Sequence, residues 1–338
     1  MNISALIQKG IARIAELPPN NWKGIGNDTA PLTVPLIAED YPAKTAVMWN
    51  AMYSRLLVPD RNMMLVADPK YLDQIMKAFR ADTRYRGGGA GVGFKEAIIP
   101  YLDEVTPLAK AMEAVNIIKK DDHGRLIGDN TDGEGYARSL EQVLAAEERP
   151  LKDTCILILG AGGSGRAIAF ALANKGAQLT ILNRTESKAR ELAGALNDYF
   201  GKTVAFGGGR ILLPSVLDKA DVVVSVIDDA VSPLDAYSTL GDMALPVTSE
   251  SIERNRVTTE RLLAGAKRSL IISDIRIRKE PTVMLSQAKE LGFKTLDGIP
   301  MVINQGVAAF WWLYQNQLVK RGIPQADVEQ IMRTAAGL

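Results

Sequence analysis

The sequence predicts a two-domain α/β protein in which one domain is a doubly wound parallel sheet that binds a dinucleotide. The first observation is length, because two domains are natural for 338 residues. The second is a strand, glycine turn, helix and strand in succession from Cys155 onward. The third is the alternation of strand-like and helix-like segments from Leu32.

The cofactor unit is predicted from the segment that begins at Cys155. The apolar run 155–159 is typical of a strand buried on both faces of a parallel sheet, and a second apolar strand follows at 179–182 after a helical pattern. Glycines at the G-x-G-x-x-G spacing lie between them. They permit a tight turn, close approach of a pyrophosphate, and close packing of helix on strand. These predicted cofactor-binding glycines are Gly160, Gly162, Gly163 and Gly165.

The end of the second strand predicts the choice of cofactor. An NAD site places a carboxylate there to bind the ribose 2′-hydroxyl, whereas this chain has Asn183, Arg184 and Thr185. A guanidinium can bind a 2′-phosphate with two hydrogen bonds. We therefore expect NADP, with Arg184 as the main determinant. The alternative is a solvated arginine at the start of a helix.

Composition excludes several classes of function. The formal charge of +1 gives no indication of a nucleic-acid or membrane partner. The single cysteine excludes intrachain disulfides and thiolate metal clusters, and fits a reducing cytoplasm. No apolar run reaches the roughly 18 residues that span a bilayer, and no signal-peptide pattern is present at the N-terminus. We expect a cytoplasmic monomer or homodimer that binds a small molecule and no metal.

The single histidine and the single cysteine are both predicted to be structural. His123 lies in a polar turn between two apolar strands, at the tip of a hairpin, where a solvated side chain is expected. Dehydrogenases with a histidine base and histidine-ligated zinc enzymes are therefore poor candidates. Cys155 begins the buried strand, so we expect a small core side chain.

The remaining elements are predicted in chain order. Residues 1–30 are an N-terminal extension, with one apolar helix face (Ile3, Leu6, Ile7, Ile11, Ile14) that packs on the body or on a partner subunit and ends at Pro18-Pro19. Strands are expected at 32–38, 63–67, 115–118, 125–127, 221–227, 269–275 and 295–296. Helices are expected at 43–57, 70–81, from 95 to 102, 107–114, 136–146, 281–291 and 301–321, with loop and helix in 228–265 and a loop or short strand at 87–93. The predicted domains are 1–131 for substrate, 132–297 for the dinucleotide, and 298–338, whose helices return to the first domain.

Two residues are candidates for proton transfer from position alone. With histidine eliminated, the groups available are lysine, aspartate, glutamate and tyrosine. Lys95 lies at a predicted helix start, where the helix dipole lowers a lysine pKa, and Asp132 lies in a turn at the domain junction. The structural alternatives are a surface lysine and an aspartate that caps the next helix.

Five motifs, in order from about Leu32 to Phe310, carry a resemblance to a known family. They are Phe94-Lys95-Glu96-Ala97 with Pro100 and Leu102-Asp103, Glu113-Ala114-Val115-Asn116, Asn130-Thr131-Asp132-Gly133, the glycine motif with Asn183-Arg184-Thr185, and Asp297-Gly298 with Met301 and Gln305-Gly306. In this combination the chain resembles the shikimate dehydrogenase family. The resemblance implies a two-domain enzyme that oxidises a ring alcohol with NADP. It also implies that Lys95 and Asp132 form the catalytic pair, that Asn116 and Gln305 bind substrate hydroxyls, and that Met301 contacts the cofactor.

The chain departs from the family pattern where that pattern binds the substrate carboxylate. The serine pair of the family aligns with Ala43 and Thr45, and Gly91 replaces a hydroxyl-bearing residue. The family's tyrosine aligns with Arg276 or its neighbour. Thr45, Lys44 and Arg276 are the candidates for binding this end of the substrate. Since charge-assisted hydrogen bonds contribute about 1.5–3 kcal/mol each, we expect weakened binding of shikimate and a related hydroxylated ring as substrate, such as quinate, an aminated analogue or a ring without the carboxylate.

Two other kinds of protein remain open. One is a ligand-binding or regulatory protein that kept the cofactor fold and lost turnover. The other is a different reductase with the same cofactor domain, such as a glutamyl-tRNA reductase, which needs a nucleophilic cysteine, or a methylene-tetrahydrofolate dehydrogenase.

Overall fold

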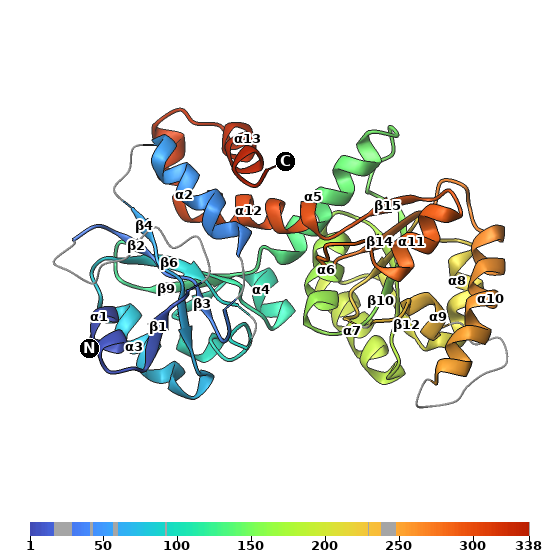
Figure 1. The fold of residues 1–338 in the computed structure, drawn as a ribbon, viewed down its shortest axis with the longest axis horizontal. Helices are drawn as coiled ribbons and strands as arrows, with labels where there is room; N and C mark the ends of the chain where they lie inside the picture. The colour runs from blue at the N-terminus through green and yellow to red at the C-terminus, as the bar shows by residue number, and fades with distance from the viewer. Residues whose placement is uncertain are drawn as a thin grey trace. The chain divides into compact units, whose positions relative to one another are not determined.

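The chain forms two compact units in the computed structural model, which describes residues 1–16, 29–40, 43–56, 60–91, 93–228, 230–237 and 248–337. Unit 1 consists of residues 1–135 and 302–338, and unit 2 consists of residues 136–301 (Figure 1). Both boundaries lie a few residues beyond the predicted ones, and Asp132 therefore falls in unit 1. No helix in the described ranges is long and apolar enough to cross a membrane.

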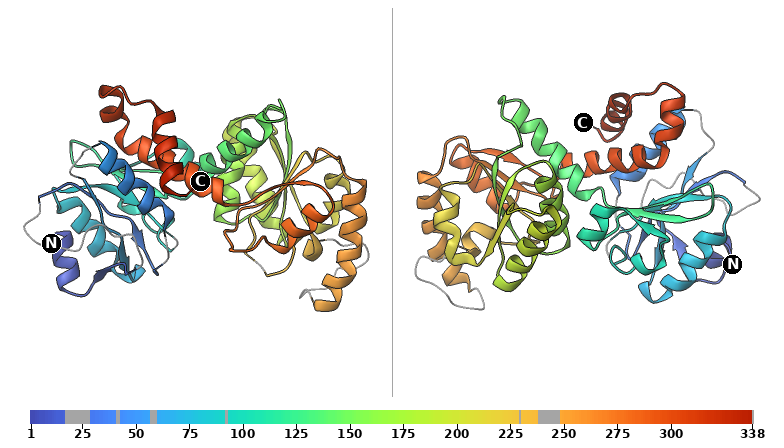
Figure 2. Two further views of the ribbon diagram at one scale, coloured as in Figure 1. Left: turned by 45° about the horizontal axis from the view of Figure 1, so that its top comes forward. Right: turned by 180° about the vertical axis from the view of Figure 1, so that it is seen from behind.

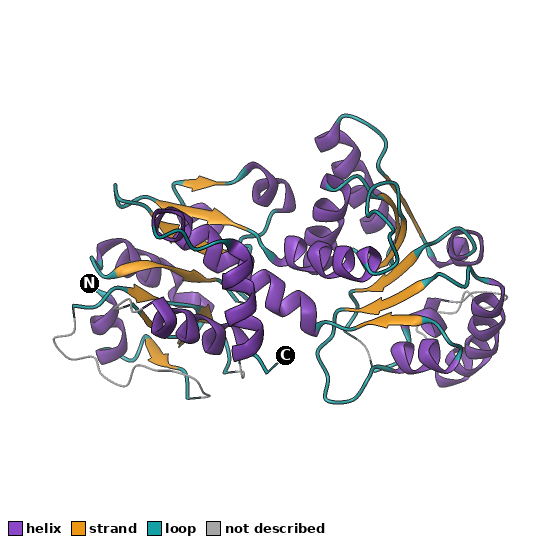
Figure 3. Ribbon diagram, turned by 90° about the horizontal axis from the view of Figure 1, so that it is seen from above, coloured by secondary structure: helices purple, strands orange, loops and turns teal. Residues whose placement is uncertain are grey.

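Unit 2 is a six-stranded sheet in the order β12-β11-β10-β13-β14-β15. Every pair is parallel, and numbered within the unit the order is 3-2-1-4-5-6, which is that of dinucleotide-binding sheets. Figure 3 shows purple helices on both faces of this sheet. The strands are β10 (Cys155–Leu159), β11 (Gln178–Leu182), β12 (Ala205–Gly208), β13 (Val222–Ser225), β14 (Ile271–Asp274) and β15 (Lys294–Leu296). The helices that begin before or within the unit are α5 (Asp132–Ala145), α6 (Gly163–Asn174), α7 (Glu186–Phe200), α8 (Leu213–Leu217), α9 (Pro233–Tyr237), α10 (Ser249–Gly265) and α11 (Val283–Glu290).

The predicted strands of unit 2 are confirmed, but one strand was missed. The central strands β10 and β13 are buried along almost their whole length, as their continuous apolar runs require. The missed strand is β12, because its sequence Ala-Phe-Gly-Gly carries no apolar run. Cys155 is partly exposed, so the prediction of a core side chain is wrong. It is the first residue of β10, at the end of the strand.

Unit 1 contains two sheets. One has six strands in the order β4-β2-β6-β8-β9-β7, and the other has three in the order β1-β5-β3. The strands are β1 (Ala12–Ile14), β2 (Leu32–Thr33), β3 (Leu36–Ile37), β4 (Arg61–Asn62), β5 (Leu65–Ala67), β6 (Tyr85–Gly89), β7 (Glu104–Val105), β8 (Ile117–Lys120) and β9 (Leu126–Asp129). The helices are α1 (Ile3–Gln8), α2 (Lys44–Leu56), α3 (Leu72–Ala81), α4 (Pro107–Met112), α12 (Ile299–Lys320) and α13 (Gln325–Ala335).

The predicted strand at 32–38 is two strands that belong to different sheets. β2 pairs with β4 and β6, whereas β3 pairs with β5. Pro35 lies between them and has no N–H to donate, so a single ladder cannot continue through it. The predicted strand at 63–67 is shorter in the structure, where β5 covers Leu65–Ala67, and β4 (Arg61–Asn62) precedes the predicted range. The strands from β1 to β6 thus alternate between the two sheets.

The N-terminal extension is a short helix followed by a strand. Helix α1 ends at Gln8, and Gly10 adopts a left-handed conformation (φ +68°) that a helix does not continue through. Beyond it, Ile14 lies in β1, which is antiparallel to β5. The prediction of one helix through Ile14 is therefore wrong. Ile3 and Leu6 are fully buried in the core of unit 1, which confirms packing on the body. Pro18 and Pro19 lie outside the described residues.

Lys95 does not begin an α-helix. Residues 93–98 form consecutive turns, which end in a short 3₁₀ helix at Ile99–Tyr101. The helix-dipole argument for the pKa of Lys95 is therefore wrong. The segment is instead fixed by its backbone, since Val115 N donates to Lys95 O at 2.8 Å.

The C-terminal helices return to unit 1, as predicted. Helices α12 and α13 both pack against α2 (Figures 1 and 2). Phe310 of α12 is fully buried, with an edge-on contact to Trp49 at 5.6 Å between ring centroids and a stacked contact to Tyr314 at 4.6 Å. Burial raises the pKa of Tyr314 well above its ordinary value, so its hydroxyl stays protonated and donates to Asp60 Oδ1 at 2.8 Å. The Tyr314 hydroxyl also lies 3.3 Å from the hydroxyl of Tyr53 in α2, and this buried contact joins α12 to α2.

We expect the Gly207→Ala substitution to destabilise unit 2. A methyl group at Gly207 in β12 would lie 2.2 Å from the backbone oxygen of Ala189 in α7, so helix and strand would have to separate. Such overpacking costs about 1–3 kcal/mol. Urea denaturation would measure the loss. The matched control is Gly194→Ala in α7, where nothing lies within 4 Å and a helix-interior alanine should stabilise by about 0.5–1 kcal/mol. Equal effects of the two substitutions would contradict the prediction.

Candidate active site

A pocket of about 140 Å³ lies within unit 1. Its walls come from α2, the β3 and β6 strands with the segments that follow them, the start of α5, and α12. Polar and apolar lining residues are both present. The polar ones are Lys95, Asp132, Asn116, Gln305 and Thr45. The apolar ones are Pro35, Ile37, Ala43, Ala46, Met64 and Ala309, together with Trp49 and Ile117.

Lys95 and Asp132 meet in this pocket. Lys95 Nζ donates to Asp132 Oδ2 at 2.5 Å, and the two side chains are 31% and 15% exposed. Asp132 is the first residue of α5, and its own N–H donates to the side chain of Asn130 at 3.0 Å. The Asp132 carboxylate therefore points away from its backbone and towards the lysine. The contact pairs the two candidate residues, and Asp132 is the first residue of α5.

Asn116 joins the ion pair to the rest of the pocket. Its Nδ2 donates to Asp132 Oδ1 at 2.8 Å, while its Oδ1 accepts from Thr131 N at 2.9 Å. The Asn116 backbone is fixed by a hydrogen bond to Asp129 O and by one from Ala90 N. Both oxygens of Asp132 are thus held, which sets the orientation of the carboxylate relative to Lys95.

Gln305 completes the polar cluster from a segment 189 residues away. Its Oε1 accepts from Asn116 Nδ2 at 3.3 Å. At the next residue, Gly306, α12 lies close to α2, since a Cβ there would lie 2.6 Å from Met48 Cε. Trp49 Nε1 donates to Gly306 O at 3.1 Å across this contact. The turn that presents Gln305 is therefore held by a buried side chain that also lines the pocket.

The predicted carboxylate end of the pocket offers one hydroxyl, that of Thr45, beside apolar residues. Ala43 and Thr45 line it, but Lys44 between them is not among the described lining residues. Gly91 also lines the pocket, and a Cβ there would lie 2.9 Å from Ile37 Cγ2. Ile37 therefore fills the space that a side chain at position 91 would need.

The predicted substrate residue Arg276 has another partner. It belongs to unit 2, and its Nη2 and Nε donate to Asp274 at 2.6 and 3.1 Å. Asp274 is fully buried and also accepts from Thr282 Oγ1 at 2.8 Å. A buried carboxylate needs such partners, because burying an unpaired charge is costly. The guanidinium neutralises this carboxylate, and the structure does not place Arg276 among the lining residues of the unit 1 pocket.

The glycines of unit 2 have the geometry that their predicted roles require. Gly160 adopts φ +112°, and a Cβ on Gly165 would lie 2.4 Å from Gly160 O, so α6 packs directly on the end of β10. Gly162 caps the N-terminus of α6 and faces open space, since a Cβ there would meet nothing within 4 Å. Gly163 begins α6. The free N–H groups of the first helical turn therefore face space that a pyrophosphate could enter, and these residues fit a dinucleotide.

The residues after β11 fit a phosphorylated ribose. Asn183 Oδ1 accepts from Ala161 N at 3.3 Å, which ties this segment to the glycine turn. Arg184 and Thr185 follow and are exposed. The nearest carboxylate, Glu186, pairs with Arg190 at 2.5 Å on the next turn of α7. Met301, the remaining predicted cofactor residue, lies in the first turn of α12 and is almost fully buried.

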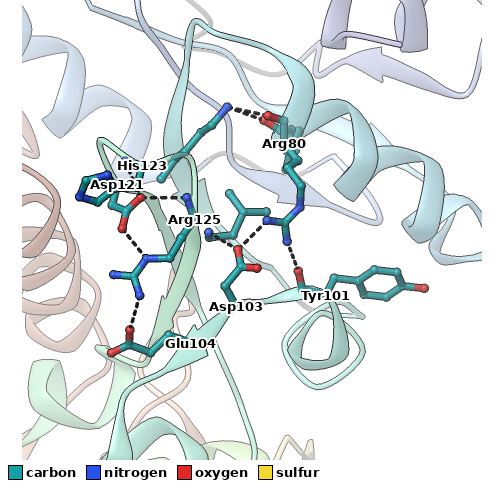
Figure 4. Close-up of polar contacts among 10 residues, drawn as sticks. Arg80, Tyr101, Asp103, Glu104, Asp121, His123 and Arg125 are labelled. Carbon is teal, nitrogen blue, oxygen red and sulfur yellow. Dashed lines mark hydrogen bonds and ion pairs between the residues drawn. The ribbon is translucent and has the colours of Figure 1, made fainter.

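His123 lies where the sequence predicts, at the tip of the β8–β9 hairpin. Figure 4 shows it beside Asp121, which accepts hydrogen bonds from His123 N at 2.9 Å and from Arg125 N at 2.8 Å. The residue is exposed and does not line the pocket. Trp49 and Met64 do line it and were missed. A signal existed for Trp49, since it lies four residues after Thr45 on the same face of a helix.

Sequence profiles match both parts of the chain. The shikimate dehydrogenase substrate binding domain matches residues 41–118, and shikimate / quinate 5-dehydrogenase matches residues 143–234. The NADP(+) shikimate dehydrogenase of Methanothermobacter thermautotrophicus is 32% identical, over 78% of this chain and 84% of its own.

Solved structures agree with this relationship. The shikimate dehydrogenase of Aquifex aeolicus has a TM-score of 0.65 at 28% identity, over 91% of this chain and 99% of its own. The 5-ketofructose reductase of a Gluconobacter strain has a TM-score of 0.66 at 27% identity, over 90% of this chain and 98% of its own. Matched profiles in both units, and a relative that aligns over most of the chain, establish that this protein belongs to the shikimate dehydrogenase family.

Proposed function

We propose that this chain is an NADP-dependent oxidoreductase of the shikimate dehydrogenase type, which transfers a hydride reversibly between NADP and the hydroxyl-bearing carbon of a hydroxylated ring. The observation that carries the proposal is the contact of Lys95 with Asp132 in the pocket of unit 1. The names of the curated relatives support the same reaction. The name of the Gluconobacter relative adds a ketose to the substrates associated with this fold.

Lys95 and Asp132 handle the proton of the reacting hydroxyl. Oxidation breaks the O–H and C–H bonds of one alcohol group, and the proton passes to the lysine and aspartate as the carbonyl forms. Because the two groups are in direct contact, the proton belongs to the pair rather than to either residue. In the reverse direction the same pair returns the proton to the carbonyl oxygen.

Asn116 and Gln305 orient the substrate. Their amide groups offer both donors and acceptors beside the ion pair, which is what several ring hydroxyls require. Asn116 also holds Asp132 in place, so its role is partly to position the carboxylate.

NADP accepts the hydride when bound, and unit 2 supplies residues that would hold it. The N-terminus of α6, opened by Gly162, would bind the pyrophosphate. Arg184 would bind the 2′-phosphate, since its exposed guanidinium follows β11 where an NAD enzyme carries a carboxylate.

We expect Lys95→Ala to abolish most turnover. Removal of a general acid or base group lowers kcat by about 10²–10⁴-fold, and Asp132→Asn should have a comparable effect. Initial rates of NADPH formation measure this, and Lys110→Ala, an exposed lysine on α4, is the control. Because the pair acts as a unit, the double variant should be no slower than the slower single variant. Unchanged turnover in Lys95→Ala would instead favour a ligand-binding protein.

We expect Arg184→Ala to lower kcat/KM for NADP by about 10- to 100-fold and to leave that for NAD unchanged, because a charge-assisted hydrogen bond to phosphate is lost. Arg190→Ala is the matched control, since Arg190 is an exposed arginine on the adjoining helix that pairs with Glu186. Equal losses of kcat/KM for the two cofactors would show that Arg184 does not bind the 2′-phosphate.

We expect Trp49→Phe to raise the KM of the ring substrate by about 3- to 10-fold with kcat nearly unchanged. The substitution keeps the ring contact with Phe310 and removes one buried hydrogen bond, to Gly306 O, which holds the turn of Gln305. Trp312→Phe on α12, the helix that carries Gln305, is the control. A lower melting temperature with unchanged KM would mean that Trp49 serves only the packing of α12.

A further inference from the structure

Resting on the proposed function, we infer that the substrate is uncharged: the pocket of unit 1 selects a neutral hydroxylated ring with one apolar edge over a ring that carries a carboxylate. The inference names the substrate class of the proposed site. Three features of the protein support it: the charge of the polar cluster, the packing of the apolar part of the lining, and the positions of Arg276 and Lys44.

The polar cluster of the pocket has no net charge. Lys95 is matched by Asp132 at 2.5 Å, and Asn116 and Gln305 add only amide groups. Asp132 has both oxygens engaged in charge-assisted hydrogen bonds. A ligand carboxylate close to Lys95 would have to compete with Asp132 for the ammonium and would also be repelled by it. A neutral hydroxyl can share the pair without either cost.

Part of the pocket lining belongs to a hydrophobic cluster. Ile37, Ala43, Ala46 and Met64 pack with Ala15 and Val66 as one cluster of buried residues. Four of these six side chains line the pocket, and each of the four is less than a tenth exposed. The apolar edge of a ring ligand binds favourably to such a surface, because its contact area is removed from water. A carboxylate placed there would lose its hydration and gain no hydrogen bonds in return.

Packing at Gly91 leaves little room for a polar side chain in this part of the lining. A Cβ at position 91 would lie 2.9 Å from Ile37 Cγ2 and 3.2 Å from Leu36 O. A hydroxyl-bearing side chain at position 91 would therefore require Ile37 to shift.

Neither of the two cationic residues predicted to bind a carboxylate is among the described residues that line the pocket. Arg276 holds the buried carboxylate of Asp274 in unit 2. Among the residues described around the pocket, Lys44 is not part of the lining, and Thr45 contributes a single hydroxyl. That hydroxyl donates and accepts, which suits a ligand hydroxyl as well as it suits an anion.

The test compares two ligands that differ only in charge, shikimate and its carboxamide. Each is titrated into the wild-type protein with NADP present, with calorimetry for the dissociation constant and NADPH formation for turnover. We expect the carboxamide to bind at least tenfold more tightly and to show a correspondingly higher kcat/KM. Tighter or equal binding of shikimate would overturn the inference, as would a failure of both ligands to bind.

The two readouts separate this inference from the proposed function. If the carboxamide binds preferentially but no NADPH forms, the inference stands and the proposed function fails. If shikimate is preferred and is turned over, the inference fails and the proposed function stands.

A pair of variants tests the apolar wall itself. Ala46→Ser adds one hydroxyl to the wall, which should tighten the binding of shikimate by about 3- to 10-fold and leave the carboxamide within twofold, because a hydroxyl donates more strongly to a charged acceptor. Ala51→Ser on the same helix, outside the pocket, should change neither. An equal gain for both ligands in Ala46→Ser would contradict discrimination by charge.

Discussion

The contact between the Lys95 ammonium and the Asp132 carboxylate is the interaction on which the site of this protein depends. The two residues lie 37 positions apart and come from a series of turns and from the first residue of a helix. Asn116 fixes the second oxygen of the carboxylate, and Gln305 joins the cluster from α12. Four chain segments thus converge on one ion pair.

The helix that carries Gln305 is positioned by contacts outside the polar cluster. Gly306 lets α12 approach α2, Trp49 bonds to the carbonyl of that glycine, and Tyr314 donates to the buried Asp60 two turns further on. These contacts are buried and directional, so a small shift of either helix would break several at once. The pocket is therefore part of the core of unit 1, which explains why one of its walls consists of packed apolar side chains.

Some features of the structure are expected from the family, and others are seen only in the packing of this chain. The parallel sheet, the glycine turn of unit 2 and the Lys95–Asp132 contact are what the relationship leads one to expect. The apolar lining around Ile37 and the hydrogen bonds of Arg276 to Asp274 are described by the structure of this chain. The Lys95–Asp132 contact and the apolar residues around Ile37 both line the pocket of unit 1, whereas Arg276 belongs to unit 2.

The sequence by itself determined those features that local patterns encode. The β10–α6–β11 unit, the hairpin with His123 at its tip and the glycine positions were all readable, because continuous apolar runs, turn residues and glycine spacing act over a few residues. The family resemblance carried by the ordered motifs also predicted the pairing of Lys95 with Asp132, which are in contact in the structure.

Only the tertiary structure decided the rest. Pro35 divides a predicted strand between two sheets, and Lys95 lies in a series of turns instead of a helix. Arg276 donates hydrogen bonds to the carboxylate of Asp274, two residues away. Gln305 reaches Asn116 across 189 residues, and Ile37 occupies the space beside Gly91. These outcomes depend on which segments the sheets and helices bring into contact, and packing between distant residues leaves no local pattern from which it could be read.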